Sequence, residues 1–130
     1  VDVIIGFNPD SFGHAAGLPT LMKQSGYQYY VFMRPQDQEQ DPSKKLPVLF
    51  WSQGPDGSRV LTLRILGSYD SSAARIPTIA ADSFATGFSD GAFFLGVGDH
   101  GGAVTKAQIQ QILHMRNDTT LPELRWSTTS

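Results

Sequence analysis

Val3-Ile4-Ile5-Gly6-Phe7 runs directly into Asn8-Pro9-Asp10-Ser11-Phe12-Gly13-His14, so an apolar segment ends in a loop that carries one aspartate between a proline and a glycine. The apolar segment predicts a buried strand over residues 3–7. Asp10 or Ser11 can cap a helix that stops at Ser25-Gly26. This order of strand, loop and helix is the repeating unit of α/β folds, which carry their reactive groups on the loops that follow the strands.

A second loop of similar composition lies near the other end of the chain. Gly96-Val97-Gly98-Asp99-His100-Gly101-Gly102 follows Phe93-Phe94-Leu95, and the apolar run predicts a buried strand over residues 92–97. If the two predicted strands belong to one parallel sheet, Asp10 and Asp99 lie at the same edge of that sheet. A pair of carboxylates facing one pocket is typical of enzymes that cleave glycosides.

The rest of the chain alternates strand-like and helix-like segments, which indicates the α/β class. Further strands are predicted over residues 27–33, 46–51 and 59–65, and a further helix is predicted after Thr105. Gln53-Gly54-Pro55-Asp56-Gly57-Ser58 predicts a β-hairpin turn. Residues 36–45 are polar and predict an exposed loop, whereas residues 69–89 fit no pattern. We therefore expect a mostly parallel sheet with flanking helices and a β-hairpin insertion.

Composition limits the classes of function. The chain has 130 residues, enough for one domain but fewer than the roughly 200 of a complete β/α barrel. Its net charge of −2 and the lack of a basic patch argue against a nucleic-acid partner, and no apolar run is long enough for a membrane helix. The absence of cysteine excludes thiolate metal sites and fits a cytoplasmic location. Because the first residue is Val1 rather than methionine, we expect a segment of a longer protein.

Five motifs of this chain resemble glycoside hydrolase family 38, the α-mannosidases, and they occur in the order found in that family. The motifs are Asn8-Pro9-Asp10-Ser11-Phe12-Gly13-His14-Ala15-Ala16, Tyr30-Val31-Phe32-Met33-Arg34-Pro35, Phe50-Trp51-Ser52-Gln53-Gly54-Pro55-Asp56-Gly57-Ser58-Arg59-Val60-Leu61, Gly96-Val97-Gly98-Asp99-His100-Gly101-Gly102 and Leu121-Pro122-Glu123-Leu124-Arg125. The last resembles a short strand of the bacterial branch. Motifs spread from end to end of the chain are far more specific than any one of them alone.

The resemblance implies a retaining α-mannosidase assisted by one zinc ion, on a β/α barrel of which this chain holds only a part. By the motif match, Asp10 is the nucleophile and a zinc ligand, and Asp99 is the general acid/base. The family's zinc site also takes a His-x-Asp pair from before the nucleophile and a histidine from beyond it, and neither is present here. We therefore expect the other ligands outside this segment and an inactive isolated chain. The expected partners are a mannose-containing glycan and the rest of the parent chain, and homo-oligomer formation is left open.

Further side chains are candidates for substrate or metal binding. Arg34 ends a predicted strand and can touch substrate or hold Asp10 ionised, but it is equally suited to an ordinary ion pair. Trp51 can stack on a sugar ring or belong to the core. His100 can contact sugar hydroxyls or solvent. His14 follows Asp10 at helical spacing and could bind a metal, but a packing role fits better because the family does not use this histidine as a ligand.

A different class of function stays open: a non-catalytic α/β domain that binds a carbohydrate or a partner protein. The missing metal ligands support this alternative. A metal-dependent carbohydrate deacetylase also uses aspartate and histidine ligands, but the retained motifs do not favour it. The sequences that flank this segment would separate the enzyme from the binding domain, since a His-x-Asp pair upstream and a histidine downstream favour the enzyme.

Overall fold

The computed structural model describes residues 2–98 and 102–128 of the chain. Within these residues the chain forms two compact units that divide between Ile65 and Leu66. The first unit holds a β-sheet and the second is mainly helical. None of the described helices is long and apolar enough to cross a membrane.

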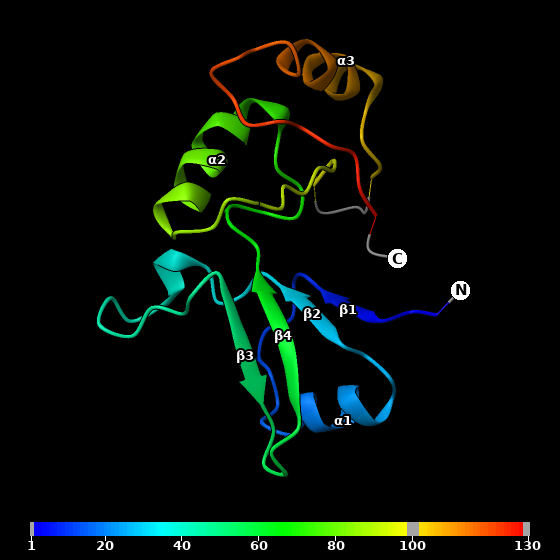
Figure 1. Ribbon diagram of the computed structural model, residues 1–130, viewed down its shortest axis with the longest axis vertical. Helices are drawn as coiled ribbons and strands as arrows, with labels where there is room; N and C mark the ends of the chain where they lie inside the picture. Colours follow the sequence, from blue (N-terminus) through cyan, green and yellow to red (C-terminus); the bar gives the residue numbers. More distant parts are fainter. Residues whose placement is uncertain (1, 99–101, 129–130) are drawn as a thin grey trace. The chain divides into compact units, whose positions relative to one another are not determined.

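The first unit is built on an open four-stranded sheet (Figure 1). Its strands are β1 (Ile5–Asn8), β2 (Tyr29–Phe32), β3 (Leu49–Gln53) and β4 (Arg59–Arg64), in the order β1-β2-β4-β3. The pairs β1-β2 and β2-β4 are parallel, whereas β3 and β4 are antiparallel. The predicted α/β class with a mostly parallel sheet is therefore confirmed for this unit.

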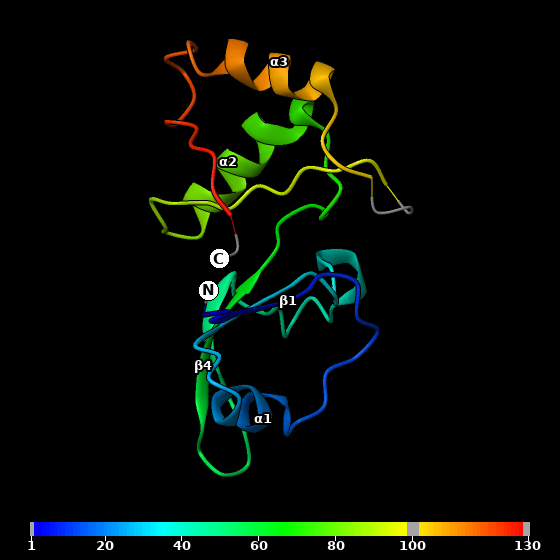
Figure 2. The ribbon, with the colours of Figure 1, turned by 90° about the vertical axis from the view of Figure 1, so that its right-hand side faces the viewer.

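Helix α1 (Leu18–Gln24) covers one face of this sheet. Figure 2 shows the helix on one side of the strands, next to β4. Met22 of the helix packs with Tyr30, Phe32 and Val60 of the sheet, and these four buried side chains are the core of the first unit.

The opposite face of the sheet is also apolar. Strand register places two rows of side chains on it: Ile5, Tyr29, Leu61 and Trp51 in one row, and Phe7, Val31, Leu63 and Leu49 in the other. Because β1 is an edge strand, Phe7 remains 44% exposed, and the strand is less buried than its apolar sequence predicts. Both faces of the sheet thus carry apolar side chains, which is the pattern of strands that are covered by other elements on both sides.

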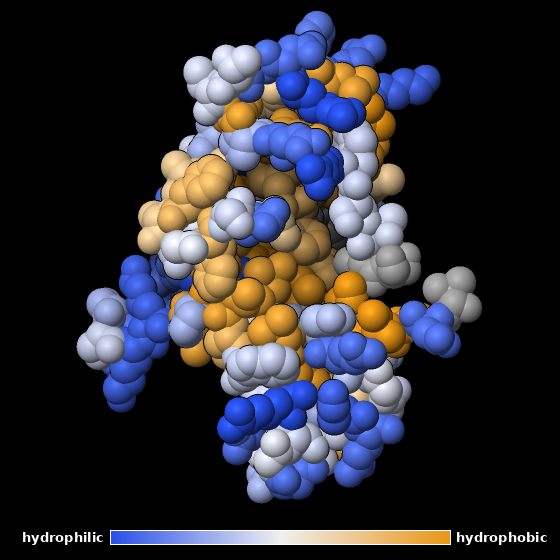
Figure 3. Space-filling view, viewed as in Figure 1, coloured by the Kyte–Doolittle hydropathy of each residue, from blue (hydrophilic) through white to orange (hydrophobic). Residues whose placement is uncertain are grey.

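Strands β3 and β4 form the predicted hairpin. The Gly54 N–H donates to the Ser58 carbonyl at 2.9 Å, and Gly57 takes a φ of 83°, which glycine adopts without steric cost. Asp56 accepts hydrogen bonds from the backbone and hydroxyl of Ser58 and from the Thr20 hydroxyl of α1. Polar side chains surround this turn, at the lower end of Figure 3. The hairpin belongs to the main sheet, because β4 pairs with β2.

The second unit contains the 3-10 turn η2 (Ala73–Arg75) and the helices α2 (Ile76–Ala85) and α3 (Lys106–Met115). Ala73, Ile76 and Ile112 form its buried core. Thr105 caps α3 as predicted, since its hydroxyl accepts the Gln108 N–H at 3.2 Å and the Gln108 side chain accepts the Thr105 N–H at 2.8 Å. Helix α2 falls in the segment that fitted no pattern.

The predicted cap of the first helix is wrong. Helix α1 begins at Leu18 without a side-chain cap, so neither Asp10 nor Ser11 starts it. Pro19 lies in the first helical turn, where its fixed φ suits the helix. Gly13 has a φ of 134°, which interrupts any helix at that point. Asp10 therefore lies in an irregular loop rather than at a helix N-terminus.

The predicted strand over residues 92–97 is also wrong. In the described part of this segment Leu95 makes an isolated bridge with Ser71, and Val97 makes another with Gly102. The segment contributes no strand to the sheet that contains β1. Phe93 and Leu95 pack against the helical core of the second unit instead. A short apolar run does not by itself distinguish a strand from a segment that packs on helices.

Candidate functional site

Asp10 and Arg34 form an ion pair at the carboxyl ends of two neighbouring strands. Asp10 lies in the loop after β1 and Arg34 lies just after β2, and the two strands are parallel. Both side chains therefore start from the same edge of the sheet. Arg34 Nε donates to Asp10 Oδ1 at 2.6 Å, and the Asp10 side chain keeps 41% of its surface exposed. The Met33 N–H donates to the Pro9 carbonyl at 3.2 Å, which ties the two loop backbones together.

Arg34 serves two carboxylates and one aromatic ring. Its Nη1 lies 2.5 Å from Glu39 Oε1, and its guanidinium lies 4.5 Å from the centre of the Phe12 ring, a cation–π contact. The hydrogen bond to Asp10 is the main cause that raises the pKa of Arg34, and the charge of Glu39 adds to it against the opposing effect of desolvation. The cation is therefore a permanent feature of this loop.

His14 joins the Asp10 loop to strand β2. Its Nε2 lies 2.8 Å from the Arg34 carbonyl oxygen, which can only accept, so Nε2 carries the hydrogen. In the neutral ring, Nδ1 then accepts the Tyr30 hydroxyl at 3.0 Å. Burial raises the pKa of Tyr30, which keeps this hydroxyl a donor. The ring also meets the edge of Phe32, with centroids 4.9 Å apart. These contacts fit the packing role expected for His14.

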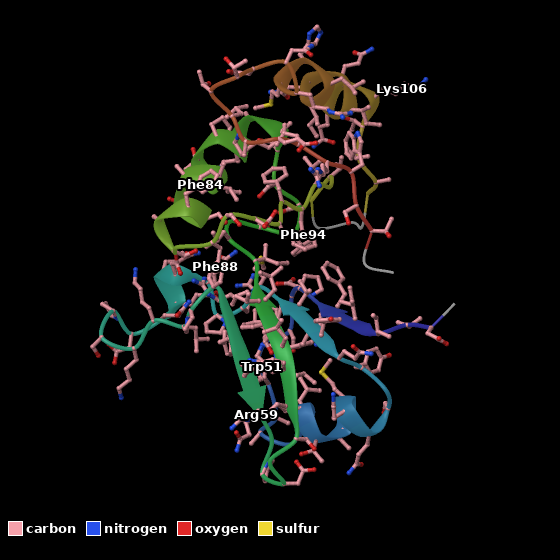
Figure 4. The ribbon with its side chains drawn as sticks, viewed as in Figure 1. Trp51, Arg59, Phe84, Phe88, Phe94 and Lys106 are labelled. Carbon is pink, nitrogen blue, oxygen red and sulfur yellow. The ribbon has the colours of Figure 1, made fainter. Side chains whose placement is uncertain are left out.

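Other predicted site residues lie elsewhere on the sheet or outside the described residues. Trp51, labelled in Figure 4, is 60% exposed on β3 and is therefore not a core residue of this structure. Strand register places Trp51 in the same row as Ile5, which is the first residue of β1. Asp10 lies beyond the opposite end of β1, after its last residue. The structure thus does not bring Trp51 to Asp10. Asp99 and His100 lie outside the described residues.

The described part of the second glycine-rich loop packs closely on Asp70. A side-chain carbon at Gly98 would come within 2.6 Å of Asp70 Oδ2, so any larger residue here would displace the Asp70 carboxylate. The hydroxyl of Ser68 donates to the other oxygen of the same carboxylate. The absence of a side chain at Gly98 thus lets the Asp70 carboxylate lie close to the loop backbone.

The described residues do not fit a complete zinc site. Among residues 2–98 and 102–128, no group of three or more His, Cys, Asp or Glu side chains is arranged to share a metal ion. A catalytic zinc site normally has three protein ligands and one open position. Asp10 could supply one carboxylate oxygen, and the remaining ligands are not among its described neighbours.

Glu39 and Phe12 belong to this site although the sequence analysis did not single them out. Glu39 lies in the polar stretch over residues 36–45, where the short 3-10 helix η1 (Asp37–Glu39) turns it toward Arg34. A spacing of five residues between an arginine and a glutamate does not predict an ion pair unless the conformation of the intervening turn is known. Phe12 is 84% exposed, and its contact with Arg34 depends on the folded loop.

Comparison with known families gives a match that spans the whole chain. The family sequence model described as "Glycosyl hydrolases family 38 N-terminal domain" matches residues 1–130. No curated protein matches the chain. The family match covers both glycine-rich loops as well as the strands that position Asp10 and Arg34.

Proposed function

The chain belongs to glycoside hydrolase family 38 through the N-terminal domain of that family, and on this basis we propose that its parent protein is a zinc-dependent retaining α-mannosidase of the bacterial branch. Asp10 is its nucleophile, and its substrate is a terminal α-linked mannose of a glycan. The observation that carries the proposal is the ion pair between Asp10 and Arg34 at the carboxyl edge of a parallel sheet.

The surroundings of Asp10 suit a nucleophile. An attacking carboxylate has to be held in one direction, because reaction requires the attacking oxygen and the anomeric carbon to be aligned. Arg34 holds Asp10 with a charge-assisted hydrogen bond of 2.6 Å. The 41% exposure of the Asp10 side chain leaves room for a sugar to approach. A carboxylate that is both fixed and accessible is the combination that the reaction needs.

The reaction proceeds in two displacements. An Asp10 oxygen attacks the anomeric carbon, the bond between that carbon and the glycosidic oxygen breaks, and the departing oxygen takes a proton from the general acid. We assign this acid to Asp99 on the basis of the motif match. Water then attacks the anomeric carbon of the glycosyl ester, gives a proton to Asp99 and releases mannose with the Asp10 carboxylate restored.

The sheet supports the assignment to part of a β/α barrel. In such a barrel the helices cover the outside of the strands, and the inward side chains pack in layers. Helix α1 on one face of the sheet fits an outer helix. The two apolar rows on the opposite face fit inward layers, and Tyr29 and Trp51 in these rows are still 39% and 60% exposed. Further strands of the parent protein would bury them.

Zinc enters the proposal through the family alone. Among the described residues, Asp10 does not belong to any group of three or more side chains that could share a metal ion, so it does not complete a site. We propose that the parent protein supplies the other ligands, as the family resemblance implies. In the full-length protein, zinc content provides a measurement of the Asp10 site that is separate from activity.

The experiment that tests the role of Asp10 replaces it with alanine in the full-length parent. Turnover of an aryl α-mannoside should fall by a factor on the order of 10⁴ or more, because the nucleophile is lost. Zinc content should fall with it, because a ligand is lost. Asp82→Ala, which removes an exposed aspartate from α2, is a matched control and should change neither quantity. Full activity of Asp10→Ala would place the nucleophile elsewhere.

Replacement of Asp99 by alanine should give a different pattern. Zinc should stay bound, and turnover should fall mainly for substrates with poor leaving groups, because these need a proton most. An activated aryl glycoside should lose much less, and added azide should restore part of the turnover by attacking the glycosyl ester. Loss of zinc, or an equal loss for all leaving groups, would remove Asp99 from the acid/base role.

The stereochemistry of the first product separates this proposal from its alternatives. NMR of the reaction mixture should show α-mannose as the initial product, because two displacements restore the original configuration. Initial β-mannose would contradict a retaining mechanism. A full-length parent that binds mannose-containing glycans without turnover would instead be a non-catalytic binding protein.

A further inference from the structure

Glu39 pairs with Nη1 of the Arg34 guanidinium, and its own carboxylate is held by the backbone of Gln36. Its Oε1 lies 2.5 Å from Arg34 Nη1. Its Oε2 accepts the backbone N–H of Gln36 at 2.6 Å, and the Gln36 side chain accepts the backbone N–H of Glu39 in return, which makes a capping box around η1. Each oxygen of the Glu39 carboxylate thus has a definite donor.

Arg34 transmits this anchoring to Asp10. A guanidinium group is planar and rigid, so the direction of its Nε–H is set once Nη1 and the plane are fixed. Glu39 fixes Nη1, and the contact with Phe12 restricts the plane. The Nε–H then meets Asp10 Oδ1 at 2.6 Å. The direction of the Asp10 carboxylate therefore depends on Glu39, although in these interactions the two carboxylates are linked only through Arg34.

Glu39 also supplies a lasting counter-charge. Before the reaction, the Arg34 cation lies between two carboxylates, those of Asp10 and Glu39. When Asp10 becomes a glycosyl ester it loses its negative charge, and Glu39 remains as the anionic partner of Arg34. Without the Glu39 charge, the guanidinium is free to turn and hold both oxygens of Asp10, as arginine does with isolated carboxylates. Both oxygens would then be engaged, and attack would become slower.

We infer that Glu39 is a positioning residue for the nucleophile, which acts through Arg34 to hold one Asp10 oxygen and leave the other available for attack. The inference rests on the proposed function, because it assigns Glu39 to the reaction of Asp10. It is independent of the assignment of Asp99.

The test is Glu39→Gln in the full-length parent. Glutamine keeps the size of the side chain and one acceptor for the Gln36 N–H, but it removes the charge that holds Arg34. The substrate should be an α-mannoside with a poor leaving group, so that attack by Asp10 limits turnover. We expect kcat to fall about tenfold or more, as for loss of a hydrogen bond to a charged group. KM should stay within about twofold, because ground-state binding is unchanged.

Asp37→Asn is the matched control on the same 3-10 helix. Asp37 pairs with Arg64 at 2.8 Å, and the Arg64 side chain is only 6% exposed. This variant makes the same change of charge and should lower the unfolding temperature, because a buried arginine loses its carboxylate partner. Its kcat should stay at the wild-type value. If Glu39→Gln gives that same pattern, with a lower unfolding temperature and unchanged kcat, Glu39 is purely structural and the inference is overturned.

Crystal structures of the parent and of Glu39→Gln provide a readout that does not need activity. In the variant, the Arg34 guanidinium should turn and contact both oxygens of Asp10; an unmoved guanidinium would overturn the inference. Failure of the proposed function looks different, since it requires a wild-type parent without turnover or an Asp10→Ala variant with full activity. Turnover that depends on Asp10 but not on Glu39 overturns the inference alone.

Discussion

Arg34 meets Asp10, Glu39 and Phe12 with three different parts of one guanidinium group. Lysine at this position would keep the positive charge, but it has neither the plane nor the fixed fork that reaches two carboxylates at once. At the scale of the single residue, shape rather than charge is therefore expected to matter here.

Arg34→Lys in the full-length parent should lower α-mannosidase turnover by about tenfold or more, because Asp10 and Glu39 are no longer held together. Thermal unfolding should change little, because partly exposed ion pairs contribute about 0–1 kcal/mol to stability. Steady-state kinetics and melting curves of the two proteins measure the two effects. A lysine variant with wild-type turnover would show that a point charge is sufficient beside Asp10.

The element scale concerns the hydrogen bond between α1 and the β3-β4 turn. Asp56 of the turn accepts the Thr20 hydroxyl, and this bond, followed by those from Ser58, lowers the pKa of Asp56 below its usual 3.8. A carboxyl whose pKa is lower in the folded state than in the unfolded state contributes stability above the unfolded pKa. That contribution is lost as the pH falls through the folded pKa.

Thr20→Val should remove the hydrogen bond that lowers the pKa of Asp56 most, and it should therefore lower the stability of the protein near neutral pH. The difference from wild type should shrink as the pH falls below about 3.8, where Asp56 becomes protonated in both proteins. Unfolding curves recorded from pH 7 to pH 3 measure this difference. Thr86→Val is the control, because the Thr86 hydroxyl donates to the Ser83 carbonyl and not to a carboxylate. A difference that stays constant with pH would show that the Thr20–Asp56 bond does not couple to titration.

At the scale of the whole molecule, the described parts of the chain, residues 2–98 and 102–128, carry the proposed nucleophile without a set of zinc ligands around it. The isolated chain should therefore show no turnover of aryl α-mannosides and only weak zinc binding, since a single carboxylate does not hold the ion. Calorimetric titration with zinc and an assay with and without a chelator measure both properties. Hydrolysis by the purified chain that a chelator abolishes would show that its own residues complete the site.

The sequence by itself determined the features that depend on a few neighbouring residues. The hairpin turn at Gly57, the end of α1 just before Ser25-Gly26 and the Thr105 cap of α3 agree with prediction, because turn and cap signals act over two to five residues. The strands β2 and β4 lie within their predicted ranges for the same reason, since alternation and apolar runs are local, whereas β1 and β3 overlap their predicted ranges but lie further along the chain. The aspartate loop after β1 was likewise visible as a motif.

Only the tertiary structure decided which distant residues meet. The pairing of Asp10 with Arg34 depends on β1 and β2 being parallel neighbours, and the approach of Glu39 depends on the turn η1. Phe93 reads as part of a strand, but it packs on helices, because an apolar run is buried by whichever surface the fold supplies. Local signals fix elements, whereas the site needs neighbours that are far apart along the chain, and their meeting depends on packing.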